Sequence, residues 1–244
     1  MAGEPILSQV ALEIRYTRGM VYLDRCGSLY VRMGDELGAA FSAQQLPTIE
    51  HTEFLSKDER LTVRFGPRNL VIFQQWVTTP ARVEQLAPKA WNIIADGLNV
   101  KGHVFRCGIR FMTQWECAAE ESNRAVLKVI PASAKLVEIF GSPSTGHYVH
   151  VFPPTNDKPA LRLEVAAIQN RFGELPKALV DRIPRFGVQL DLDYVMPGSD
   201  APFDQLKPDP KTYTLSIDQL RHFLRTSWES AQAASLKFSE AAGL

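Results

Sequence analysis

Four charged side chains on two predicted strands are the residues best suited to chemistry. Asp191 and Asp193 are separated by one residue, and Arg106 and Arg110 by three, with Gly108 midway between them. Side chains at positions i, i+2 and i+4 of a strand share one face. Each pair is therefore expected to present two like charges to the same side of a sheet.

The aspartate pair has the chemistry of a metal or acid–base site. Two carboxylates at this spacing can bind Mg²⁺ or divide the roles of acid and base. Glu164, on a neighbouring predicted strand, would be a third ligand. The alternative is an ordinary polar face, solvated or paired with Arg162, because cross-strand ion pairs are common in sheets.

The arginine pair has the chemistry of an anion site. Gly108 carries no side chain, so a ligand or another backbone can approach the strand closely between Arg106 and Arg110. Two guanidinium groups there suit a phosphate or a carboxylate. The alternative is that both arginines form ordinary surface ion pairs.

Other catalytic and metal motifs are not found in the sequence. His147 and His150 are spaced like a metal pair, but positions i and i+3 of a strand point to opposite faces, so no metal site is predicted. There is no G-x-S-x-G sequence, no P-loop and no dinucleotide fingerprint. We therefore predict no catalytic residue and no cofactor, and favour a non-catalytic protein.

Charge and cysteine content indicate the setting. The chain has 27 basic and 27 acidic residues, divided 13 and 14 over residues 1–121 and 14 and 13 over the rest. This balance does not indicate a nucleic-acid partner, although a local patch is possible, and it disfavours an anionic membrane. Three cysteines without a C-x-x-C spacing, no signal peptide and no membrane-length apolar run predict a cytoplasmic protein without a membrane partner.

The first half of the chain reads as strand, helix, strand, strand, helix, strand. Alternating apolar residues predict strands at 10–16, 61–65, 70–76 and 104–115, with a Gly-Pro-Arg-Asn hairpin turn at 66–69. Helical spacing predicts helices at about 20–41 and from Thr79, as N-cap, to Gly97. This order is that of a ferredoxin-like unit.

The second half is predicted to contain shorter elements and one long helix. Strands are expected at 125–130, 147–152, 160–167 and 186–195, short helices at 131–140 and 177–182, and a loop at 197–210. Ser216 and Gln219 form a capping box, and the helix that follows has a broad apolar stripe. The residues of this stripe are Ile217, Leu220, Phe223, Leu224, Trp228, Ala231 and Leu236.

These elements predict an α+β fold made of two fused antiparallel-sheet modules. The first module, residues 1–121, is ferredoxin-like in its order of elements, and the second, residues 122–244, ends in the long amphipathic helix. Because no linker separates them, the two can equally form one continuous domain.

The strand Arg106-Cys-Gly-Ile-Arg-Phe-Met-Thr-Gln resembles the core of an uncharacterised bacterial family. That family is sporadically distributed, has proteins of about this size, and carries an Arg-Tyr-Ile-Asn-Arg-like motif after an apolar strand. Arg110, Phe111 and Met112 match its first three places, whereas Thr113 and Gln114 depart from Asn and Arg. The resemblance implies a fold and a size, and no activity.

Three functions are compatible with this sequence. The leading expectation is a scaffold or protein-binding protein that self-associates or binds another protein, with surplus apolar surface on the last helix as a contact. The alternative is an RNA-binding or RNA-processing protein built from paired ferredoxin-like modules, in which Arg106 and Arg110 bind RNA. The third is a metal-dependent hydrolase that uses Asp191 and Asp193.

Overall fold

The structure is a computed structural model of the 244-residue chain. It describes residues 5–17, 21–37, 41, 43–45, 47–130, 134–140, 146–155, 158–170, 177–199 and 210–244. The predicted loop at 197–210 therefore lies mostly outside the described residues. Among the helices of the described chain, none is both long and apolar enough to cross a membrane.

The described chain contains nine strands and six helices. The strands are β1 (Ile6–Tyr16), β2 (Ala43–Gln45), β3 (Thr52–Ser56), β4 (Leu61–Phe65), β5 (Asn69–Val77), β6 (Val104–Glu116), β7 (His147–Phe152), β8 (Ala160–Gln169) and β9 (Phe186–Val195). The helices are α1 (Tyr22–Leu37), α2 (Ala81–Gly97), α3 (Ala119–Val129), α4 (Ala134–Phe140), α5 (Lys177–Val180) and α6 (Ile217–Ala242).

All nine strands belong to one antiparallel sheet in the order β2-β3-β4-β5-β1-β6-β9-β8-β7. The central part, β4-β5-β1-β6, together with α1 and α2, has the strand order of a ferredoxin-like fold. The predicted α+β class and the ferredoxin-like order of the first module are therefore confirmed. Two further strands, β2 and β3, extend this unit at one edge and were not predicted.

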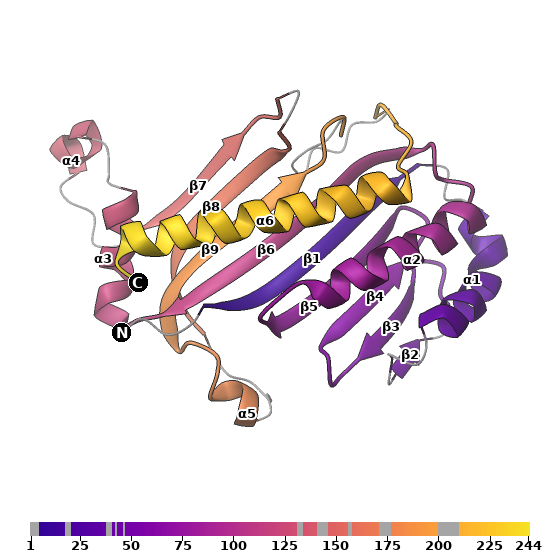
Figure 1. The fold of residues 1–244 in the computed structure, drawn as a ribbon, viewed down its shortest axis with the longest axis horizontal. Coiled ribbons are helices and arrows are strands. Elements are labelled where there is room, and N and C mark those ends of the chain that lie inside the picture. The colour runs from indigo at the N-terminus through magenta and orange to yellow at the C-terminus, as the bar shows by residue number, and fades with distance from the viewer. Residues whose placement is uncertain are drawn as a thin grey trace.

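The helices α1, α2 and α6 lie across one face of the sheet (Figure 1). The strand β1 shows why, because Val10, Leu12, Ile14 and Tyr16 are buried while the residues between them are only partly buried. This period of two directs every second side chain to the helix layer, where burial of apolar area stabilises the fold. The opposite face receives the polar residues of the same strands.

Residues of both predicted modules contribute to the same sheet. The strand β6, from residues 1–121, pairs with β9, from residues 122–244, over the register Gly108–Val195 to Glu116–Gly187. One hydrophobic cluster contains buried residues from both halves, for example Ile109 and Leu192. The sheet therefore places polar side chains of β6 and β9 next to one another.

One predicted element is wrong. Residues 125–130 are not a strand, because α3 covers Ala119–Val129. The run Ala-Val-Leu-Lys-Val-Ile has the composition of a buried strand, but the buried residues are Ser122, Ala125 and Val126, at helical spacing. Glu120 and Glu121 in the first turn favour the N-terminal end of a helix.

The two predicted helix starts have different outcomes. Thr79 is not the N-cap of α2. The N-cap position is Pro80, and the helix start has no side-chain capping hydrogen bond. The capping box of α6 is confirmed. The Ser216 side chain accepts a bond from the Gln219 backbone at 3.1 Å, and the Gln219 side chain accepts one from the Ser216 backbone at 2.9 Å.

Candidate functional site

The four candidate residues come together on the sheet face opposite the helices. Because β6 and β9 are paired, Arg110 lies opposite Asp193, and Met112 lies opposite Asp191. The two like-charged pairs that the sequence suggested are therefore one mixed cluster. We call Glu13, Arg106, Arg110, Asp191 and Asp193 the charge cluster.

Asp191 and Arg110 form the tightest ion pair of the cluster. The Arg110 Nε donates to both carboxylate oxygens of Asp191, at 2.8 and 3.0 Å, and its Nη2 also donates to Oδ2. The Asp191 side chain is 1% exposed, whereas that of Arg110 is 36% exposed. The hydrogen bonds that Arg110 donates to Asp191 raise the pKa of the Arg110 guanidinium, although burial acts to lower it. Arg110 thus compensates a carboxylate that has almost no contact with water.

Arg106 links β1 to β9 through two carboxylates. Its Nη1 donates to Glu13 at 2.8 Å and its Nη2 to Asp193 at 3.3 Å. The side chain is only 7% exposed. Its guanidinium lies over Gly108, where an added Cβ would be 3.1 Å from Cζ and both Nη atoms. The space that the glycine leaves open is therefore taken by Arg106 of the same strand.

The pKa values of the two acids that bind Arg106 shift in opposite directions. Burial raises the pKa of Asp193 to about 6, against the lowering effect of the Arg106 charge. Burial also acts to raise the pKa of Glu13, but the hydrogen bond from Arg15 and the charges of Arg106 and Arg15 outweigh it and lower the pKa. Glu13 therefore stays ionised to a lower pH than Asp193 and is the more persistent anionic partner of Arg106.

Glu164, the expected third metal ligand, accepts hydrogen bonds from two neighbours. Arg162 Nη2 lies at 2.6 Å from Oε2, and His147 Nε2 lies at 2.9 Å from Oε1. Arg162 is opposite Asp193 in the β8–β9 register but bonds to Glu164 on its own strand. Within the described ranges, no group of three His, Cys, Asp or Glu side chains could hold a metal ion.

The cluster chiefly fixes β1, β6 and β9 to one another. Asp191 and Asp193 accept hydrogen bonds from arginines of β6, and the charge of Arg162, the partner suggested by the sequence, also acts on Asp193. Glu13 was not predicted as a site residue, although its outward position in the alternation of β1 was a usable signal. In the structure it lies opposite Gly108. The lone pairs of Asp191 are occupied by a guanidinium, which is the chemistry of a structural ion pair.

A second region, which the sequence analysis did not single out, is the edge of the sheet at β7. In the described part of the chain, this strand pairs only with β8. Its side chains Val149, Val151 and Phe152 are 44%, 50% and 44% exposed. The strand His-Tyr-Val-His-Val-Phe contains no Lys, Arg, Asp, Glu or Pro. The opposite edge is the three-residue strand β2, so β7 is the longer edge.

Three rings form a ladder along the helix-side face of β7. Tyr148 and His150 stack with centroids 5.4 Å apart and planes 11° apart, and His150 and Phe152 lie 5.1 Å apart at 42°. The Tyr148 hydroxyl also hydrogen-bonds to His150 Nδ1 at 2.6 Å. Val149 and Val151 lie on the other face with His147. Both faces of this edge therefore expose apolar or aromatic surface.

The apolar stripe of α6 packs mainly into the core. Leu220, Phe223, Leu224 and Ala231 are buried, and the Trp228 ring packs against Phe111 with centroids 5.4 Å apart and planes tilted by 41°. Leu236 is the exception, because it is 62% exposed. The expected surplus of apolar surface on this helix is thus concentrated at one leucine.

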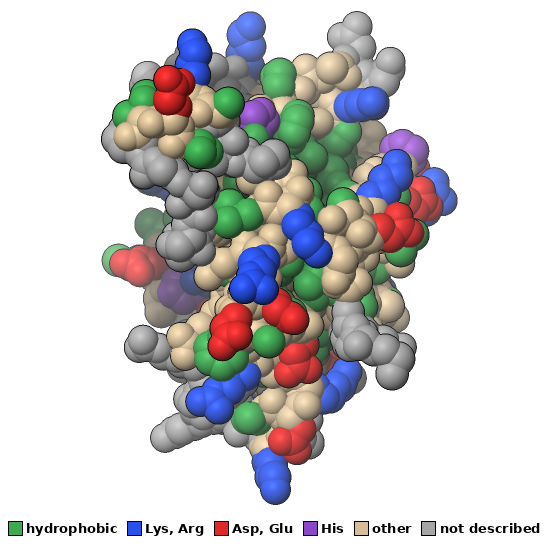
Figure 2. Space-filling view, turned by 90° about the vertical axis from the view of Figure 1, so that its left-hand side faces the viewer, with side chains coloured by type: hydrophobic (Ala, Val, Ile, Leu, Met, Phe, Trp, Pro, Cys, Tyr) green, Lys and Arg blue, Asp and Glu red, His purple; other side chains and the backbone are tan. Residues whose placement is uncertain are grey.

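The surface at the α3 end of the molecule carries both signs of charge. Basic and acidic side chains are interspersed among the described residues in this view (Figure 2). A mixed surface of this kind gives a weak field for attracting nucleic acid.

No protein family model matches this chain, and no curated protein matches it.

Proposed function

We propose that the chain is a protein-binding scaffold that self-associates by pairing β7 of one copy with β7 of a second copy. The observation that carries this proposal is the six-residue edge strand with apolar or aromatic side chains on both faces and no Lys, Arg, Asp, Glu or Pro. An unpaired edge presents backbone donors and acceptors to another strand. Sheets of soluble proteins usually protect such edges with charge, proline or short strands.

The residue types favour a second copy as the occupant. An antiparallel pair of identical strands about a two-fold axis perpendicular to the sheet places each face against its own equivalent. Val149 and Val151 then meet valines of the partner, and the ring ladder of Tyr148, His150 and Phe152 meets rings. Aromatic and β-branched cross-strand pairs are the favourable ones in sheets.

The described cysteines Cys26, Cys107 and Cys117 are all free thiols. We propose a reducing, cytoplasmic compartment for the protein, and the free thiols support this proposal.

The test is the solution mass of matched valine variants. Val151→Lys places a charge on the proposed interface, whereas Val31→Lys makes the same change on α1, where the valine is 57% exposed. By sedimentation velocity, we expect the wild type and Val31→Lys to have twice the 27.3 kDa chain mass. Val151→Lys should be a monomer, with a dissociation constant raised roughly tenfold or more.

Two outcomes would overturn the proposal. One is a wild-type protein that stays monomeric at high micromolar concentration. The other is a Val151→Lys variant that remains dimeric while its thermal unfolding is unchanged, which would place the contact elsewhere on the molecule.

A second candidate, RNA binding, is favoured by the ring ladder. Unstacked bases bind on exposed aromatic side chains of sheets, and the three rings of β7 lie in a row, with Tyr148 and His150 stacked and Phe152 tilted against His150. Phe152→Ala should then weaken binding of single-stranded RNA in fluorescence anisotropy, whereas Val151→Lys, on the other face, should not. Arg106 and Arg110 remain the other residues to test, as a double alanine variant, although both hold carboxylates.

A further inference from the structure

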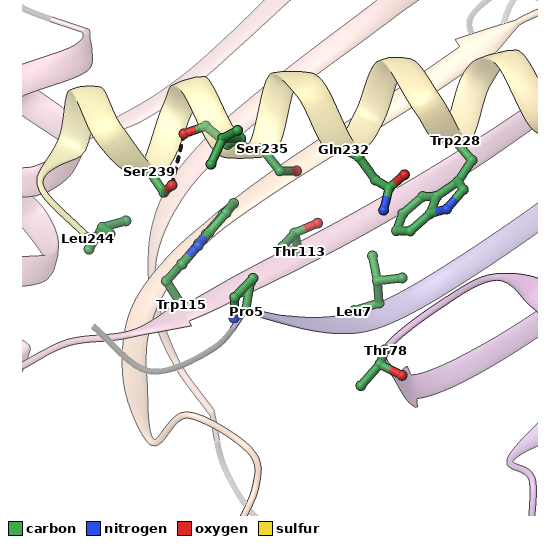
Figure 3. Close-up of a pocket in the computed structure, with 11 residues that line it drawn as sticks. Pro5, Leu7, Thr78, Thr113, Trp115, Trp228, Gln232, Ser235, Ser239 and Leu244 are labelled. Atoms are coloured by element: carbon green, nitrogen blue, oxygen red, sulfur yellow. Dashed lines mark hydrogen bonds between the residues drawn. The ribbon is translucent and has the colours of Figure 1, made fainter. Parts of the chain in front are cut away.

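A groove runs beneath the C-terminal half of α6 (Figure 3). Its volume is about 450 Å³, within the range of small-molecule pockets. The sheet supplies its floor through Leu7 of β1 and Thr113 and Trp115 of β6. Trp228 and Gln232 point toward this floor from α6.

The groove exists because helices α2 and α6 lie side by side along only part of their lengths. The first turns of α2 lie beside the first half of α6, where Glu84 is close enough to Glu229 for their charges to interact. The chain enters α2 only at Ala81, after the end of β5. On this flank, the second half of α6 therefore faces the sheet beyond the start of α2 (Figure 1).

Two stripes of α6 differ in character in this half. Ala231, Phe238 and Ala242 are buried in the core. The adjacent stripe of Trp228, Gln232, Ser235 and Ser239 follows spacings of four, three and four residues, which keep it on one face of the helix. This stripe begins with an indole and continues with amide and hydroxyl groups, and it lies above a mostly apolar floor. Such a combination is typical of sites that bind a partly polar ligand.

Among the residues that the structure describes, none with an ionisable side chain lines the groove. Its eleven residues are proline, leucine, threonine, serine, glutamine and tryptophan. Leu236, which is 62% exposed, stands at the groove as an uncovered apolar residue. A charged group that entered would lose its hydration without gaining a charged side-chain partner. An uncharged hydroxyl or carbonyl can instead bond to Gln232 or Ser235.

From this chemistry we propose that the groove binds an uncharged, elongated apolar molecule that carries a hydroxyl or carbonyl group. Its apolar body lies between Trp228, Trp115 and Leu236, and its polar group meets the Gln232 and Ser235 side chains. This site lies on the helix side of the sheet, apart from both the charge cluster and the β7 edge. It does not depend on self-association.

The first test is binding of the uncharged fluorophore N-phenyl-1-naphthylamine to the wild-type protein and two matched variants. Leu236→Glu and Leu23→Glu replace leucines that are 62% and 52% exposed, on α6 and α1. We expect saturable one-to-one binding that Leu236→Glu weakens roughly tenfold or more and Leu23→Glu leaves unchanged. Ser235→Trp, which fills the groove, should abolish binding while the protein keeps its circular dichroism spectrum.

The second test is the charge preference of the site. Octan-1-ol and octanoate have the same chain length, and we expect the alcohol to displace the fluorophore at a lower concentration. The proposal is overturned if the wild type shows no saturable binding, if both glutamate variants weaken binding equally, or if octanoate displaces the fluorophore better than the alcohol.

Discussion

The guanidinium of Arg106 lies over the backbone of Gly108, two residues further along the same strand. A Cβ at Gly108 would be 3.1 Å from three atoms of that guanidinium. From this position Arg106 reaches Glu13 on one side and Asp193 on the other. The absence of a side chain at residue 108 therefore serves an intramolecular ion-pair network.

A comparison of two glycine substitutions tests this relationship. Gly108→Ala should lower the free energy of unfolding by only about 1 kcal/mol, because the flexible end of Arg106 can move away. Gly187→Ala should cost more, about 2–3 kcal/mol, because its Cβ would be 2.0 Å from the Trp115 carbonyl oxygen. Urea denaturation measures both, and an equal loss would contradict the contrast.

The stability of the protein should depend on pH through Asp193. Its pKa is about 6 in the folded state against an ordinary 3.8, so between these values the folded state holds a proton that the unfolded state releases. The contribution of Asp193 to the free energy of unfolding is therefore fully present below pH 4. It falls by about 2–3 kcal/mol as the pH rises through 6. Asp193→Asn should remove this decline.

Denaturation midpoints measured from pH 4 to pH 7 give the comparison. Asp218→Asn is the control, because that carboxylate is 95% exposed and its ion pair with Arg221 spans 3.7 Å. The assignment is wrong if the wild-type and Asp193→Asn curves run parallel.

The Asp191–Arg110 pair should show strong coupling in a double-mutant cycle. Arg110→Ala leaves an almost completely buried carboxylate without its cation, so we expect a loss of about 2–3 kcal/mol in unfolding free energy. Removing both side chains should cost less than the sum of the single changes, by about 1–3 kcal/mol. Additive losses would show that the pair contributes little.

The N-cap of α6 should be worth about 1 kcal/mol. Ser216→Ala removes the acceptor for the Gln219 backbone N–H and breaks the capping box. Ser28→Ala is a suitable control, because its hydroxyl bonds to the Arg25 carbonyl in the middle of α1. Thermal unfolding should separate the two variants, and equal melting temperatures would contradict the assigned role of Ser216.

The elements most accurately predicted from the sequence are those whose pattern is produced by burial on one face. β9 was predicted at its observed bounds, and the inward row of β1 was predicted correctly from Val10 to Tyr16. β3 was missed because two of its three inward residues, Thr52 and Ser56, are hydroxyl residues and give no apolar alternation. α3 was misread because its apolar residues are consecutive in the chain.

Four residues of the candidate site could be predicted from the sequence, but the ion pairs between them could not. Alternation correctly placed Asp191 and Asp193 on one face, and likewise Arg106 and Arg110. Which strands are neighbours is decided by the sheet order, and a sequence does not reveal that β6 lies beside β9. The like-charged pairs therefore looked like two open sites, whereas together they neutralise one another.

The order of strands in the sheet also constrains how the chain acquires its structure during synthesis. The hairpin of β7 and β8 is made before β9, yet β9 is the strand that joins this hairpin to β6. A nascent chain that ends before Phe186 contains the complete β4-β5-β1-β6 unit, with one side of β6 awaiting its partner. The same chain contains a β7–β8 hairpin that has no strand to attach to. Closure of the sheet is therefore a late, long-range event, of the kind that slows folding.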